Sequence, residues 1–296
     1  MTDPQRFFAR AEALLERIER LLPAEPREPD WKASTAFRWR NRGGRGEITS
    51  VAYPSRVRLA DLQCIDRPKQ AMDQNTRQFL AGLPANNALL WGPRGTGKSS
   101  LIKALLNEYA GEGMRLIEVE KEHLVDLPEI VEHLYDRPER FILFCDDLSF
   151  EENDASYKAL KVVLDGSINS TPDNVLVYAT SNRRHLLPEY RDENLDARNV
   201  NGEIHFGDVI EEKISLSERF GLWLAFHPFS QDAYLTIVDY WLERLEVPDR
   251  GNEALRQAAL QWALLHGSRS GRSAWQFARD WAGRIRLQAR GNGSHD

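Results

Sequence analysis

Eight consecutive residues have the types and the spacing that hold a phosphate chain. Residues 92–99 fit the pattern G-x-x-x-x-G-K-[ST]. Glycines in this pattern let backbone N–H groups turn inward, and the helix that follows adds its positive dipole end. Lys98 can reach the β- and γ-phosphates, and the Ser99 hydroxyl can bind Mg²⁺. The pattern predicts a nucleotide site made of Gly92, Pro93, Arg94, Gly95, Thr96, Gly97, Lys98, Ser99 and Ser100.

Two acids follow a second informative stretch. Residues 141–145 are all apolar, which is typical of a strand buried on both faces of a parallel sheet. Asp146 and Asp147 come next, at the carboxyl end where such sheets bind ligands. We expect Asp146 to complete the magnesium shell opposite Ser99. The alternative is that both acids simply cap the end of the strand.

A polar residue ends another apolar run. Residues 175–182 predict a further buried strand that ends in polar residues, of which Asn182 is the last. An asparagine there could orient a water against the γ-phosphate, although asparagine also simply ends strands.

Other apolar runs predict the elements that must position these residues. Residues 88–91 predict the strand before the phosphate loop, and residues 100–109 predict the helix after it. Further strands are expected at 115–119 and 222–226, and residues 189–214 read as a polar surface loop with one helical turn. Helices are expected at 68–80, 124–135, 157–168, 231–245, 253–266 and 273–289, of which the last three would form a small helical domain.

The N-terminal part carries two further patterns. Residues 3–22 predict an amphipathic helix, which we expect to pack on its own chain rather than on a partner, and Pro23, Pro26 and Pro29 predict an extended linker. Residues 31–46 interleave aromatic and basic side chains. That mixture could bind single-stranded nucleic acid, but its alternation also fits a half-buried strand, which we favour. The residues concerned are Trp31, Phe37, Trp39, Arg38, Arg40, Arg42 and Arg45.

Composition narrows the class of protein. The 296 residues carry a formal net charge of −6, which argues against binding a polyanion by bulk charge. No apolar run approaches membrane-spanning length, and the N-terminus lacks the features of a signal peptide. Cys64 and Cys145 are far apart and match no metal-binding spacing. We expect a soluble, cytoplasmic protein without a membrane partner.

From about residue 57 to 290 the chain resembles the AAA+ ATPases. More closely, it is similar to an uncharacterised family of bacterial predicted ATPases, domain of unknown function family 815. Segments 86–100, 179–186 and 217–229 carry this closer likeness.

The resemblance implies a P-loop α/β fold, a three-layer sandwich around a parallel five-stranded sheet in the order 5-1-4-3-2, followed by a small all-α lid. The expected division of the chain is an N-terminal helix and linker (1–30), the nucleotide-binding domain (31–229), the helical lid (230–290) and a disordered tail (291–296).

The resemblance also implies roles for residues outside the phosphate loop. Asn182 matches the sensor on the fourth strand, and Arg272 matches a second sensor at the start of the last helix. Arg219 matches an arginine finger that acts in trans, which implies a homo-oligomer. Ile65 and Asp66 lie where AAA+ proteins pack the segment before the loop on the adenine. The implied ligands are ATP with Mg²⁺, and ADP after turnover.

One departure from the family pattern concerns the general base. Most AAA+ enzymes have Asp-Glu where this chain has Asp146-Asp147, and aspartate is one methylene shorter. Glu151 or Glu152 could substitute. The leading hypothesis is an ATPase that remodels a protein client. The alternatives are an ATP-dependent switch with little turnover, a nucleic-acid-associated loader and, last, a small-molecule kinase.

Overall fold

The computed structural model describes residues 4–19, 28–42, 44–150, 154–165, 172–184, 186, 198–200, 203–205, 216, 218–248 and 251–292. Four expectations concern residues outside these ranges: Pro23 and Pro26 of the linker, the substitutes Glu151 and Glu152, most of the loop at 189–214, and residues 293–296 of the tail.

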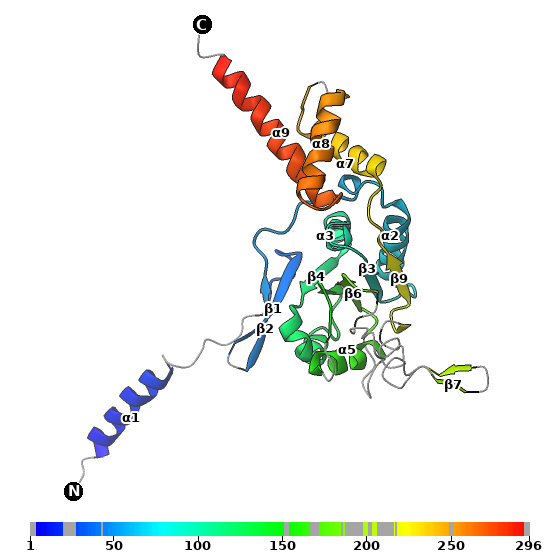
Figure 1. The fold of residues 1–296 in the computed structure, drawn as a ribbon. Helices are drawn as coiled ribbons and strands as arrows, with labels where there is room; N and C mark the ends of the chain where they lie inside the picture. Colours follow the sequence, from blue (N-terminus) through cyan, green and yellow to red (C-terminus); the bar gives the residue numbers. More distant parts are fainter. Residues whose placement is uncertain are drawn as a thin grey trace.

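A seven-stranded sheet organises the chain, in the order β2-β1-β4-β5-β6-β3-β9 (Figure 1). Neighbouring strands run parallel except β1 and β2, which are antiparallel. The predicted five-stranded sheet was therefore too small, because β1 and β2 extend it beyond β4 and make it mixed. The strands are β1 (Ala36–Arg42), β2 (Arg45–Ser50), β3 (Ala88–Trp91), β4 (Met114–Glu118), β5 (Arg140–Cys145), β6 (Val175–Ser181) and β9 (Leu222–Ala225).

Helices cover both faces of the sheet. The helices α2 (Asp66–Leu80) and α3 (Lys98–Tyr109) pack on one face. The short α4 (Leu127–Glu132) and α5 (Ala155–Asp165) pack on the other face. Strand β5 contributes Phe141, Leu143 and Cys145 to one core and Ile142 and Phe144 to the other, which explains its unbroken apolar run. Three 3₁₀ helices complete this part: η1 (Leu59–Asp61), η2 (Ala110–Glu112) and η3 (Lys121–Asp126).

Burial of the aromatic side chains in the N-terminal segment supports a structural role for it. Trp31, Phe37 and Trp39 are 6%, 1% and 0% exposed. In β1 the alternation places Phe37 and Trp39 on the face that meets α4, and the Trp39 indole N–H donates to Asp126 at 2.8 Å. These rings are therefore not available to stack on nucleic-acid bases.

Three C-terminal helices form a core of their own: α7 (Gln231–Arg244), α8 (Glu253–Leu265) and α9 (Gly271–Asn292). Ser230 caps α7 by accepting from the Ala233 N–H at 3.2 Å, and Asn252 caps α8 by accepting from the Ala254 N–H at 2.8 Å. Helix α9 continues two residues into the tail that was expected to be disordered from residue 291. Figure 1 shows these helices beyond the end of α3, on one side of the sheet.

Two further segments differ from what was expected from the sequence. The N-terminal helix α1 (Pro4–Glu19) does not bury its apolar stripe on the chain, because Phe7, Phe8, Leu14 and Leu15 are 54–69% exposed. Within the predicted loop at 189–214 the described residues form two short antiparallel strands, β7 (Arg198–Val200) and β8 (Glu203–His205), which were not expected from the sequence.

Among the described residues, every helix is too short or too polar to span a bilayer. The cytoplasmic location stays a prediction.

Candidate nucleotide-binding site

The phosphate loop joins the end of β3 to the start of α3. Gly95 and Gly97 have φ of +76° and +103°, a left-handed backbone that side-chain-bearing residues rarely adopt. Thr96 closes the turn by donating its hydroxyl to the Pro93 carbonyl at 2.8 Å. Helix α3 then begins at Lys98 with its N-terminus directed at the loop, where its free N–H groups favour an anion.

Two oxygen ligands suited to Mg²⁺ meet at this edge of the sheet. The Ser99 hydroxyl donates to Asp146 Oδ1 at 2.6 Å, and the Thr180 hydroxyl donates to the same oxygen, also at 2.6 Å. Hydroxyl and carboxylate oxygens are hard donors of the kind that Mg²⁺ takes beside phosphate oxygens. The donor set therefore fits the predicted ion, with Ser99 and Asp146 as the residues that would hold it.

Lys98 lies under the loop and is 6% exposed. Its ammonium donates to the carbonyls of Gly92 at 2.6 Å and Pro93 at 2.9 Å, and to Asn182 Oδ1 at 3.2 Å. Burial lowers the pKa of Lys98, an effect that the nearby charges of Asp147 and Asp146 oppose. A largely dehydrated cation gains more from a phosphate than a hydrated one would.

Asp147 is held from two sides. Its Oδ1 accepts a short hydrogen bond from the Asn182 amide, and its Oδ2 pairs with the Arg94 guanidinium at 3.2 Å. Its backbone φ is +54°, and its N–H donates to the Thr180 hydroxyl at 2.9 Å. Asn182 thereby connects Lys98 to Asp147, as expected of a residue at the end of this strand.

A cavity of about 840 Å³ opens between the phosphate loop and the C-terminal helices. The loop and the two acids line one part of it. Another part is apolar, and there the ring centroids of Trp241 and Trp275 lie 4.5 Å apart. The residues that line this part are Ile65, Phe229, Ile237, Trp241 and Trp275. Such a cavity has the size and the mixed character of a nucleotide site.

Asp66 does not belong to this cavity. Its side chain is 84% exposed and pairs with Lys69 at 3.4 Å in the first turn of α2. Of the two residues expected near the adenine, Ile65 alone lines the cavity, because α2 begins at Asp66 and turns it toward solvent.

The two predicted arginines lie in different places. Arg272 lines the cavity from the first turn of α9, whereas Arg219 is not among the lining residues. Arg219 lies just before β9 and forms an ion pair with Asp165 at the end of α5. The structure thus brings together all the predicted site residues except Arg219 and Asp66.

Residues 32–285 match a family described as protein of unknown function (DUF815). The chain belongs to this family. No curated protein sequence matches the chain.

Solved structures agree on the fold. A RuvB variant from Thermotoga maritima is 16% identical with a TM-score of 0.53, over 78% of this chain and 66% of that one. The AAA domain of FIGL-1 in complex with ADP is 18% identical with a TM-score of 0.51, over 83% and 80%. The DUF815 chain thus spans slightly less than two thirds of the RuvB chain. Its fold is that of the AAA+ P-loop ATPases.

Sequence reasoning missed three residues of the DUF815 site. Thr180 contacts both acids, and its position near the end of β6, two residues before Asn182, could have indicated it, since alternate residues of a strand share a face. Trp241 and Trp275 were expected in the core of the helical domain. They line the cavity because of how α7 and α9 meet the phosphate loop, for which the sequence carries no signal.

The phosphate loop contacts α9 so closely that Gly95→Ala should separate them. A Cβ at Gly95 would lie 2.8 Å from Ser270 Cβ, and the Gly271 N–H donates to the Gly95 carbonyl at 2.8 Å. Gly113 has a similar φ of +94° but open space around it. We expect Gly113→Ala to lower the free energy of unfolding by about 1–2 kcal/mol, and Gly95→Ala by about 1–3 kcal/mol more. Urea denaturation measures both, and equal losses would contradict a tight contact.

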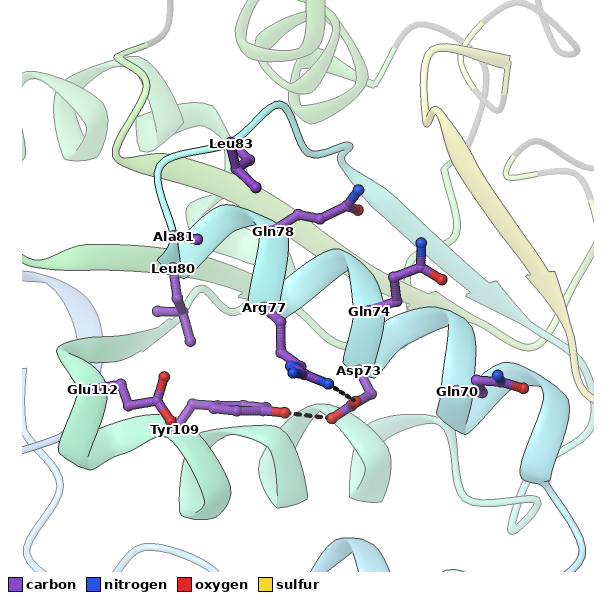
Figure 2. Close-up of a pocket in the computed structure, with 10 residues that line it drawn as sticks. All are labelled: Gln70, Asp73, Gln74, Arg77, Gln78, Leu80, Ala81, Leu83, Tyr109 and Glu112. Carbon is purple, nitrogen blue, oxygen red and sulfur yellow. Dashed lines mark hydrogen bonds and ion pairs between the residues drawn. The ribbon is translucent and has the colours of Figure 1, made fainter.

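A second depression, of about 780 Å³, lies between α2 and the C-terminal end of α3 (Figure 2). Asp73 lines it, accepts a hydrogen bond from the Tyr109 hydroxyl at 2.5 Å and pairs with Arg77 at 3.9 Å. Desolvation, and then this bond to Asp73, raise the pKa of Tyr109. None of the predicted site residues lines this depression, and Tyr109, Asp73 and Arg77 contact one another within it.

Proposed function

We propose that this protein is a Mg²⁺-dependent ATPase that works as a homo-oligomer and uses hydrolysis to remodel a protein client. One observation carries the proposal: a phosphate loop, a hydroxyl–carboxylate pair for Mg²⁺ and a second acid held by an amide meet in one cavity. The AAA+ fold supports it, since this fold places its nucleotide at the same edge of the sheet.

Each residue of the site has a role in this reaction. Ser99 and Asp146 would hold the metal ion, which would supply positive charge against the charge of the phosphates when it is bound. Lys98 exchanges its carbonyl acceptors for phosphate oxygens. Asp147, oriented by Asn182, accepts a proton from the attacking water as a new bond forms to the γ-phosphorus and the bond to the bridging oxygen breaks. Arg272 stabilises the phosphate charge.

The position of Arg219 supports the oligomeric part of the proposal. Within one chain this residue pairs with Asp165, and the cavity is lined without it. In the proposed assembly Arg219 of one subunit reaches the phosphates held by its neighbour. A nucleic-acid client is less favoured, because the aromatic side chains that could stack on bases are buried.

Phosphate release tests the metal site. We expect the purified protein to hydrolyse ATP only with Mg²⁺, and Asp146→Asn to raise the half-saturating Mg²⁺ concentration about 10- to 100-fold. The reason is that the substitution removes the charge of the carboxylate that accepts from Ser99. Asp232→Asn removes an exposed carboxylate in the first turn of α7 and is the matched control. An unchanged Mg²⁺ requirement in Asp146→Asn would argue against this role.

The contacts of Asp147 favour a second candidate, an ATP-dependent switch with little turnover. Both carboxylate oxygens of Asp147 are already engaged, by Asn182 and Arg94. A switch would bind ATP tightly and release no phosphate under assembling conditions. Gain of hydrolysis in Asp147→Glu would then locate the block at this residue.

A further inference from the structure

Arg94 occupies one of the variable positions of the phosphate loop, which the motif leaves free. Its guanidinium NH2 nevertheless pairs with Asp147 Oδ2 at 3.2 Å, across 53 positions of sequence. Both residues line the cavity. The contact therefore joins the loop that binds phosphate to the acid that would activate water.

This pair adds little to stability. The side chains of Arg94 and Asp147 are 76% and 53% exposed, and water screens an ion pair at such positions. The ion pair instead fixes the position of the Asp147 carboxylate. Asp147 has one methylene fewer than glutamate, so the place of its carboxylate is set by its backbone and by the groups that contact it. Asn182 holds one oxygen and Arg94 holds the other.

We propose that Arg94 is a positioning residue for Asp147. It holds the shorter carboxylate at the mouth of the phosphate loop, turned toward the side from which water attacks. The inference rests on the proposed ATPase function. It predicts that Arg94 acts on the rate of hydrolysis through Asp147, rather than on nucleotide affinity.

Steady-state kinetics of Arg94→Ala test this role. We expect kcat to fall about tenfold, a part of the 10²- to 10⁴-fold that a positioned acid–base group contributes. The KM for ATP should change less than about twofold, and Arg94→Lys should regain part of the rate because a cation returns. Arg77→Ala is the matched control, since Arg77 is also an exposed arginine paired with an aspartate, but on α2 (Figure 2).

A double-mutant cycle with Asp147→Glu separates action through Asp147 from direct contact with nucleotide. If Arg94 acts through Asp147, its removal costs clearly less in the Asp147→Glu background, where the longer side chain reaches further. Equal losses in both backgrounds, or a rise in KM that accounts for the loss, overturn the inference.

The rate of ATP hydrolysis by the wild type shows whether the positioning role of Arg94 alone is wrong or the ATPase function as well. An active wild type with an unchanged kcat in Arg94→Ala overturns the inference and leaves the ATPase standing. A wild type that hydrolyses no ATP under assembling conditions overturns both.

Discussion

Lys98→Ala should abolish phosphate release and weaken ATP binding. The Lys98 ammonium is the buried cation of the site, held among the Gly92 and Pro93 carbonyls and Asn182. Without this ammonium the carbonyl and amide oxygens that it now contacts would face the β- and γ-phosphates and repel them. Loss of one preorganised donor of this kind lowers kcat by about 10²- to 10³-fold.

Phosphate release and fluorescent-nucleotide titration measure the two effects of Lys98→Ala. Lys158→Ala removes an exposed lysine of α5 and is the matched control. Circular dichroism checks that both variants fold. Hydrolysis at the wild-type rate in a folded Lys98→Ala protein would exclude this cavity as the site of reaction.

Arg219→Ala should also abolish turnover, but only through the neighbouring subunit. An arginine that reaches the transferred phosphoryl group in trans raises kcat by about 10³- to 10⁵-fold. Since this arginine does not line the cavity of its own chain, ATP affinity should stay near the wild-type value. Phosphate release from the assembled variant measures the loss.

Mixing two inactive variants tests the direction of the effect. In a mixed oligomer, an Arg219→Ala subunit keeps an intact phosphate loop and receives Arg219 from a Lys98→Ala neighbour, so activity should return. Asp165→Ala breaks the same ion pair without removing Arg219 and is the control for structural damage. If assembled mixtures stay inactive, Arg219 does not act between subunits.

Local sequence determined most of what could be predicted about the site. The residues of the phosphate loop are consecutive in the sequence. Asp146 and Asn182 each come after an apolar run that predicts a strand. Because parallel strands end at one edge, their ends could be brought together without knowing the packing. The prediction that Asp66 lies near the adenine was wrong. The direction of its side chain depends on where α2 begins, and sequence locates helix boundaries poorly.

Long-range contacts account for the rest. The alternation in residues 37–40 predicted a strand, but its pairing with β4 joins residues about 80 positions apart, for which one sequence carries no signal. The same holds for Arg94 and Asp147 and for the two tryptophans on the cavity wall. These three contacts could be recognised only in the folded structure.

The hydrogen bond from the Gly271 N–H to the Gly95 carbonyl has a mechanical consequence. It fixes the first turn of α9 to the phosphate loop, and the 22 residues of this helix extend about 33 Å from that anchor. A tilt of about 10° at the anchor would displace the far end by about 6 Å, given that length. Because α9 shares one core with α7 and α8, the three helices would move together as a single lever arm anchored at the phosphate loop.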